Sequence, residues 1–174
     1  MTSISLSCSE KTIALKDLKN TKINFEIWDT CGQEKYRHLV NMFFKEAKAV
    51  IFVYDSTSRK SFDDIKNYWY NKVKECTPES SVLAVAANKI DLFDKEQVTE
   101  EEGKKFAEEI NAIFEETSAF NVFGINELFE KIGMKLVDLG ENENNNEEKK
   151  LNILLKKEDI TKNTNYKTKC CYFI

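Results

Sequence analysis

The most informative stretch of this sequence is Ile27-Trp28-Asp29-Thr30-Cys31-Gly32-Gln33-Glu34. Apolar residues at every second position from Ile23 to Ile27 predict a strand, which ends abruptly at an acid, a hydroxyl and a glycine. Asp29 can hold Mg²⁺ directly or through water, the N–H of Gly32 can approach an oxyanion, and Gln33 can orient an attacking water. A plain strand-to-loop turn has the same composition. Motifs elsewhere in the chain are therefore needed to distinguish a phosphate-binding site from a turn.

Composition narrows the class of protein. The 174 residues, 41% of them hydrophobic, are enough for one domain and a tail. No apolar run is long enough to span a membrane, and residues 1–10 lack the basic and apolar regions of a secretory signal. The net charge of −4 argues against general nucleic-acid binding. Five cysteines without metal-ligand spacing indicate a reducing compartment, and His38, as the only histidine, argues against a Ser-His or Cys-His catalytic pair.

Hydrophobic patterns predict strands that alternate with helices. This order is typical of an α/β fold with a mostly parallel sheet. Two strands joined by a hairpin are followed by runs typical of buried strands, and capping signals mark the helices. The expected strands are 11–15, 22–28, 49–54, 82–87 and 112–116, and the expected helices are 35–48, 61–76, 99–111 and 125–139.

Polar clusters follow the expected strands. In parallel sheets, ligands bind beyond the carboxyl ends of the strands, where the strand order reverses. The candidate clusters are Asp29 to Gln33, Asp55-Ser56-Thr57, Asn88-Lys89-Ile90-Asp91 and Thr117-Ser118-Ala119.

The later clusters favour a guanine base. The carboxylate of Asp91 can accept hydrogen bonds from a purine that carries N1–H and an exocyclic amine side by side, which guanine does and adenine does not. The stem of Lys89 can lie across the base, Asn88 can brace the loop, and backbone N–H groups of 117–119 can reach the guanine O6. Each cluster alone is also a common turn composition, but their succession at consecutive strand ends favours a nucleotide site.

These motifs resemble those of the Ras-superfamily small GTPases, and within them the Rab family. The resemblance covers roughly residues 11–139. It rests on Trp-Asp-Thr-Cys-Gly-Gln-Glu-Lys-Tyr-Arg (28–37), Met-Phe-Phe-Lys-Glu-Ala (42–47), Val-Tyr-Asp-Ser-Thr (53–57), Asn-Lys-Ile-Asp (88–91) and Glu-Thr-Ser-Ala (116–119).

The resemblance implies a role for each matching residue. Asp29 would hold Mg²⁺ through water, Gly32 would contact the γ-phosphate and Gln33 would position the attacking water. Trp28 and Phe43 would lie on the surface that Rab effectors contact, although ordinary packing explains them equally well. The residues expected to bind the nucleotide are Gly32, Asn88, Lys89, Asp91, Ser118 and Ala119.

The sequence also departs from the family pattern. None of its five glycines opens the phosphate-binding motif Gly-x-x-x-x-Gly-Lys-Ser/Thr. We therefore expect a partial small-GTPase fold without the first strand, the P-loop, the first helix and most of switch I, from an incomplete gene model or a degenerate paralogue. The missing strand would leave a slot between the strands ending at Trp28 and Tyr54, with backbone groups costing about 1–3 kcal/mol each if buried unsatisfied. Cys31 replaces the usual alanine, and Phe120 stands where the family has a lysine.

Residues 141–174 have the composition of a disordered hypervariable tail, following a GTPase domain at 1–140. A short apolar patch at 151–155 is either part of a charged linker or a docking site for a prenylation or extraction chaperone. The chain closes with Cys170-Cys171-Tyr172-Phe173-Ile174, which matches a Rab double-cysteine prenylation motif unless the pair is accidental. Two lipid anchors and nearby lysines would hold the protein on a membrane.

The resemblance implies a GTP/GDP switch in intracellular vesicle traffic, with Mg²⁺ as cofactor. Its partners would be Rab effectors, an exchange factor, a GTPase-activating protein and prenylation chaperones, on the cytoplasmic face of intracellular membranes with a cytosolic pool. The alternative is a non-enzymatic, prenylated module that binds Rab partners through Trp28, Phe43 and the tail without nucleotide.

Overall fold

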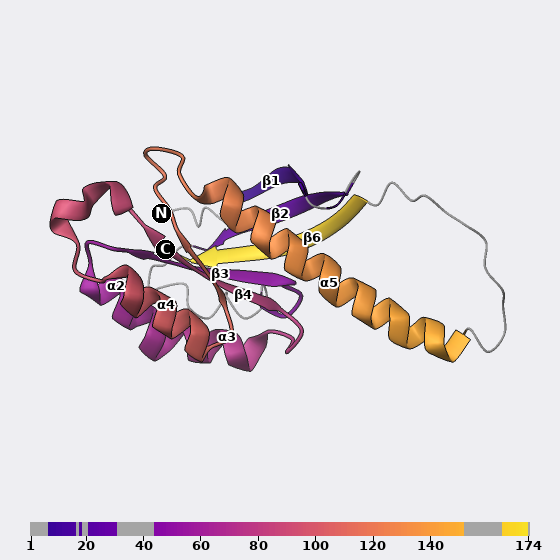
Figure 1. Ribbon diagram of the computed structural model, residues 1–174. Helices are drawn as coiled ribbons and strands as arrows, with labels where there is room; N and C mark the ends of the chain where they lie inside the picture. Colours follow the sequence, from indigo (N-terminus) through magenta and orange to yellow (C-terminus); the bar gives the residue numbers. More distant parts are fainter. Residues whose placement is uncertain (1–6, 17, 19–20, 31–43, 152–164, 174) are drawn as a thin grey trace, which may run out of the picture.

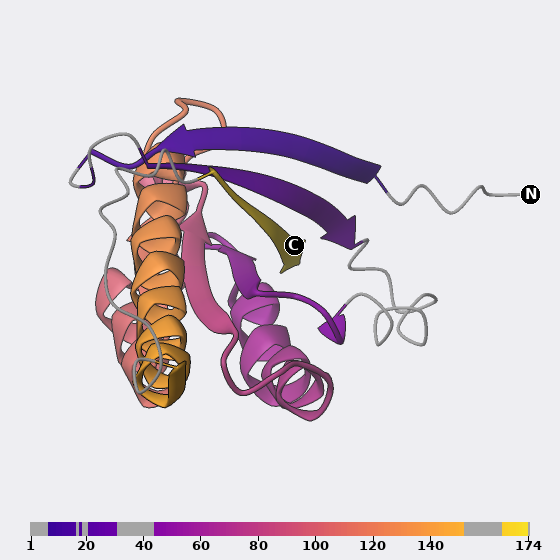
Figure 2. The same cartoon turned by 90° about the vertical axis from the view of Figure 1, so that its right-hand side faces the viewer.

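The computed structural model describes residues 7–16, 18, 21–30, 44–151 and 165–173. One mixed sheet has helices on both faces (Figures 1 and 2). The strands are β1 Ser7–Ala14, β2 Lys22–Thr30, β3 Ala49–Asp55, β4 Val82–Asn88, β5 Ile113–Glu116 and β6 Asn165–Phe173. The helical segments are α2 Arg59–Asp64, the π-helical η2 Ile65–Trp69, α3 Tyr70–Cys76, the 3₁₀-helical η3 Ile90–Lys95, α4 Glu100–Glu109 and α5 Ile125–Leu151.

The sheet order is β1-β2-β6-β3-β4-β5. Only β1 runs antiparallel to its neighbour, because the predicted hairpin joins it to β2 with Leu15 N–H donating to Thr21 O at 3.1 Å. The remaining neighbours are parallel. The α/β class with a mostly parallel sheet is therefore confirmed.

Two hydrophobic clusters hold the helices against the sheet. On one face, Phe52 and Tyr54 of β3 are buried with Phe62 of α2 and Phe106 of α4, and the rings of Tyr54 and Phe62 are 4.9 Å apart. On the other face, α5 buries an apolar stripe that includes Ile132 against β2, β3 and β4. Burial on both faces explains why β3 and β4 are continuous apolar runs.

Several elements differ from the prediction in their boundaries or in their burial; β1, for example, begins at Ser7 rather than at Lys11. The helix expected from Ser61 begins at Arg59, because the Ser58 side chain caps it by accepting from Ser61 N–H. The last strand, β5, is half-buried rather than buried, since it lies at the edge of the sheet. The cap predicted at Thr99 is confirmed as a capping box with Glu102. Most of the helix expected at 35–48 lies outside the described residues.

The region after Gly140 differs most from the prediction. Backbone of 141–151 continues α5, and β6 forms beyond it, so these two parts of the expected disordered tail have regular structure. The expected open slot is also wrong: β6 lies between β2 and β3 and pairs with both (Figure 1). A pairing between strands so distant in sequence leaves no local signal, which is why composition alone predicted disorder. The division of the chain at residue 140 stays a prediction.

Candidate functional site

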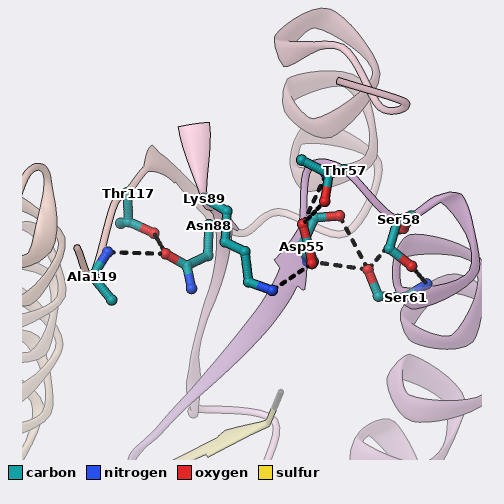
Figure 3. A network of polar contacts seen from close by, with 8 residues as sticks. All are labelled: Asp55, Thr57, Ser58, Ser61, Asn88, Lys89, Thr117 and Ala119. Carbon is teal, nitrogen blue, oxygen red and sulfur yellow. Dashed lines mark hydrogen bonds and ion pairs between the residues drawn. The ribbon is translucent and has the colours of Figure 1, made fainter. Parts of the chain in front are cut away.

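The carboxyl end of β3 presents a carboxylate with several donors around it (Figure 3). Oδ1 of Asp55 accepts from the N–H of Thr57 at 2.8 Å and from its hydroxyl at 2.6 Å. Oδ2 accepts from the ammonium of Lys89 at 2.7 Å. Partial burial would raise the pKa of Asp55, but the hydrogen bonds from Lys89 and Thr57 outweigh it and hold that pKa below its usual value.

Lys89 stands in an unusual backbone conformation. Its φ of 65° and ψ of 31° place it in the left-handed region, where a non-glycine residue costs about 1–2 kcal/mol. This conformation turns the chain from β4 into η3, and the side chain reaches across to the neighbouring strand and pairs with Asp55. Strain of this kind gathers at functional sites, and the loop that contains Lys89 also contains Asn88 and Asp91.

Asn88 ties two loops together. Its Oδ1 accepts from the backbone N–H of Ala119 at 3.2 Å and from the Thr117 hydroxyl at 3.5 Å (Figure 3). In this structure Asn88 therefore links the loop at 88–91 to the loop at 117–119. The N–H of Ala119, expected to reach guanine O6, donates to Asn88 here, so a bound base would have to share that donor.

Asp91 is held by Ser118. The Ser118 hydroxyl donates to Oδ1 of Asp91 at 2.5 Å and accepts from the N–H of Asn121 at 3.1 Å. Ser118 is 1% exposed and Asp91 is half-buried, so the carboxylate is fixed from one side and open to solvent on another. Prediction from sequence gave the 117–119 loop only backbone roles, and the side chain of Ser118 was missed.

A hollow of about 590 Å³ lies beside this pair of residues. Asp91 and Ser118 line it together with Phe93, Phe123 and residues at the start of α5, whereas Asn88, Lys89 and Ala119 do not. The hollow therefore coincides only in part with the predicted guanine site. Phe120, which stands where the family has a lysine, is 86% exposed.

The residues predicted for the phosphate end are only partly described. Asp29 is half-buried at the end of β2, and Trp28 beside it is half-buried against the cluster that contains Phe52 and Tyr54. Gly32, Gln33 and Phe43 lie outside the described residues. Within the part of the chain that the structure describes, no group of three or more His, Cys, Asp or Glu side chains is placed to hold a metal.

The site residues predicted from the sequence do not include Asp55, although its cluster follows a predicted strand. The parallel register of β3 and β4 sets Asp55 opposite Asn88, and this register is seen only in the folded sheet. Sequence alone shows that two strand ends are polar but not which side chains meet there.

The fold and this site define an α/β protein whose polar loops gather at the carboxyl ends of parallel strands, as in nucleotide-binding domains. A sequence profile described as the Ras family matches residues 2–138. The chain therefore belongs to the Ras family, and the relatives that it matches include Rab proteins.

Three relatives show the extent of the similarity. Ras-related protein Rab-22A of Mus musculus is 43% identical over 118 residues, which is 68% of this chain and 60% of that protein. Ras-related protein Rab-31 of Mus musculus is 43% identical over 122 residues, covering 70% of this chain and 62% of the relative. Ras-related protein Rab5 of Nicotiana tabacum is 41% identical over 119 residues, covering 68% and 59%. The chain thus spans about 60% of the length of the relatives it matches.

Proposed function

We propose that this Rab-like small GTPase binds GTP and GDP and acts as a nucleotide-controlled switch in vesicle traffic. The observation that carries the proposal is the loop pair at the ends of β4 and β5. Asn88 joins 88–91 to 117–119, and Ser118 fixes the carboxylate of Asp91. This arrangement presents a carboxylate with a defined orientation, which is what recognition of a guanine edge requires.

The roles of the other residues follow from family membership. Asp29 would hold Mg²⁺ through water, since oxygen ligands and retained waters suit this ion. Gly32 would contact the γ-phosphate and Gln33 would position the attacking water. Mg²⁺, when bound, would neutralise charge on the phosphates. The printed sequence carries no Gly-x-x-x-x-Gly-Lys-Ser/Thr motif, so the described residues account for base recognition rather than for phosphate binding.

We also propose lipid attachment at Cys170 and Cys171. Two anchors hold a protein on a membrane where one binds marginally. In the described part of the chain, no helix has the length and apolar character needed to cross a bilayer. Attachment would place the switch on the cytoplasmic face of intracellular membranes, with a cytosolic pool. Its partners would be Rab effectors through Trp28 and Phe43, an exchange factor, a GTPase-activating protein and prenylation chaperones.

The alternative of a nucleotide-free, prenylated module gains no support from the comparisons, because the matching profile and relatives are Ras-related proteins. A binding measurement separates the two functions directly.

Isothermal titration of the purified chain with GDP, GTP and ADP in Mg²⁺ tests the proposal. We expect guanine nucleotides to bind at least about tenfold more tightly than ADP, because adenine lacks the N1–H and amine edge. Asp91→Ala should remove that preference, and Asp94→Ala, an exposed carboxylate in the same η3 segment, should leave it unchanged. Absence of binding, or equal affinity for ADP and GDP, would overturn the proposal.

A further inference from the structure

The large hydrophobic side chains that are exposed in the described part of the chain all lie on two loops, which follow the neighbouring strands β4 and β5. Leu92 and Phe93 belong to η3, and Phe120, Val122 and Phe123 belong to the loop between β5 and α5. Phe93 is 75% exposed. Soluble proteins rarely leave contiguous apolar surface open to water, so such a patch indicates contact with another molecule.

The hollow of about 590 Å³ lies within this patch. Phe93, Val122 and Phe123 line it, whereas Leu92 and Phe120 do not. Its volume is in the range typical of ligand sites. None of the three apolar residues that line it has a part in the proposed guanine site, so nucleotide binding leaves this surface unexplained.

The loop after β5 holds its apolar side chains in fixed positions. Ser118 and Phe123 exchange backbone hydrogen bonds of 3.1 and 3.0 Å, and the Ser118 hydroxyl accepts from the N–H of Asn121. Val122 has a φ of 57°, a strained conformation that β-branched residues rarely adopt. The backbone therefore presents Val122 and Phe123 to solvent in a preorganised way, which lowers the entropy that a partner has to remove on binding.

The charged side chains that line the hollow are both carboxylates, Asp91 and Glu127. Within the described residues Glu127 has no ion pair, in contrast to Glu115 and Glu130, which both pair with lysines. Asp91 is assigned to the guanine base, which leaves Glu127, in the first turn of α5, without a partner. An unpaired carboxylate beside aromatic walls is complemented by an arginine or lysine next to a large apolar group.

We infer that this hollow is a docking site for a partner protein, which inserts a large apolar side chain against Phe93 and Phe123 and pairs an adjacent arginine or lysine with Glu127. This inference goes beyond the proposed function and does not depend on nucleotide binding. The apolar surface continues beyond the hollow to Leu92 and Phe120, as in a protein interface with a central anchor.

The carboxylates disfavour two other occupants. An anionic membrane surface would be repelled by Asp91 and Glu127. A second copy of the chain, docked about a twofold axis, would bring the same carboxylates of both copies together. A basic and apolar segment of another protein meets neither obstacle.

Selection from a library of random short peptides tests the chemistry of the occupant without assuming its sequence. The library is displayed on phage, depleted on the Phe93→Ala chain and then selected on the unmodified full chain. We expect the enriched peptides to share an aromatic residue or leucine next to an arginine or lysine. Enrichment of acidic peptides, or no enrichment after the depletion, would overturn the proposal.

Affinity measurements then assign the contacts. Fluorescence anisotropy follows a labelled peptide from the selection, and Phe93→Ala and Glu127→Lys should each weaken its binding at least about tenfold. Phe120→Ala is the matched control, because Phe120 is also exposed and belongs to the same patch but does not line the hollow. It should change the affinity less than about twofold. An equal loss from Phe120→Ala would overturn the proposal.

An exchange of charges separates a direct ion pair from an effect on folding. A peptide with glutamate in place of its basic residue should bind the unmodified chain at least about tenfold more weakly, and Glu127→Lys should restore most of that loss. Glu108→Lys, an exposed position on α4, makes the same change in net charge and should restore none of it. Failure of Glu127→Lys to restore binding would overturn the proposal.

The other occupants are outcomes of tests on the same chains. The unmodified chain should not float with vesicles of phosphatidylcholine and phosphatidylserine, and light scattering should find it monomeric. Flotation that Phe93→Ala abolishes would overturn the proposal in favour of a membrane. A dimer that Phe93→Ala dissociates would overturn it in favour of a second copy.

Saturating GDP separates this inference from the proposed function. The peptide should bind in the presence and absence of GDP with affinities within about threefold. Complete displacement by GDP would overturn the proposal, because the hollow would then be the base site itself. If the chain binds no GDP, the proposed function fails while the peptide result stands.

Discussion

The ammonium of Lys89 lies 2.7 Å from Oδ2 of Asp55, which joins the polar ends of two neighbouring parallel strands. The proposed function places the stem of this lysine against the guanine base. Its ion pair with Asp55 gives that stem a fixed direction, and the partially buried carboxylate also accepts two hydrogen bonds from Thr57.

The first prediction concerns the pH dependence that Asp55 produces. Its pKa is lower in the folded state, so its contribution to stability is present above the unfolded pKa of about 3.9 and is lost as pH falls through the folded pKa. Asp55→Ala should lower the free energy of unfolding by about 1–2 kcal/mol at pH 7, a modest value because Lys89 is half exposed. Urea unfolding at pH 7, 5 and 3 should show this difference shrinking only at the lowest pH. A difference that persists unchanged at pH 3 would contradict the assignment.

The second prediction concerns the buried hydroxyl of Tyr54. Among the described residues it has no hydrogen-bond partner, and burial, with Glu116 nearby, raises the pKa of Tyr54 far above its usual value. Tyr54→Phe removes the unsatisfied group and should raise the free energy of unfolding by about 1 kcal/mol. Thermal unfolding by circular dichroism measures it. A loss of stability would show that the hydroxyl has a partner after all.

The third prediction compares two glycines of the C-terminal half. Gly124 has a φ of +71°, and a Cβ there would lie 1.9 Å from the carbonyl oxygen of Glu116. Gly124→Ala should therefore destabilise the protein by at least about 2 kcal/mol. At Gly140, within α5, a Cβ meets nothing within 4 Å, so Gly140→Ala should instead stabilise the helix by up to about 1 kcal/mol. Denaturant unfolding of both variants checks this contrast. Equal changes in the free energy of unfolding would be evidence against the close approach of Gly124 to Glu116.

The fourth prediction concerns Ser118 as a positioning residue. Ser118→Ala removes the hydroxyl that donates to Asp91, so the carboxylate loses its fixed orientation. Affinity for GDP should fall about tenfold, corresponding to the loss of one hydrogen bond to a charged group. Calorimetry measures the affinity. Ser80→Ala, which changes an exposed serine outside the loops at 88–91 and 117–119, is the control and should leave the affinity for GDP unchanged. Unchanged GDP affinity in Ser118→Ala would remove Ser118 from the site.

Local patterns predicted most of the fold. The runs at 49–54 and 82–87 identified β3 and β4 because strands buried on both faces are continuously apolar, and Thr99 with Glu102 identified the start of α4. The position of β6 could not be predicted in this way, because pairing between residues 22–30 and 165–173 depends on the assembled sheet. Residues 165–173 also include two lysines, Lys167 and Lys169, whereas central parallel strands are typically continuous apolar runs.

The same limit applies to the site. Motif spacing singled out Asn88, Asp91 and Ser118, because each follows a strand. The contacts between the strand ends, from Lys89 to Asp55 and from Ser118 to Asp91, arise only when parallel strands set their ends side by side. Single-sequence patterns identify the strand ends but not the partners across them.

The most direct test of the central claim, that Asp91 recognises guanine, exchanges its carboxylate for an amide. Asn at this position offers one acceptor and one donor, which match the N1–H and the 2-oxo group of xanthine instead of the two donors of guanine. We predict that Asp91→Asn loses at least about tenfold in affinity for GDP and gains affinity for xanthosine diphosphate, while Asp94→Asn keeps the preference for GDP. An Asp91→Asn chain that binds both nucleotides as the unmodified chain does would contradict the account.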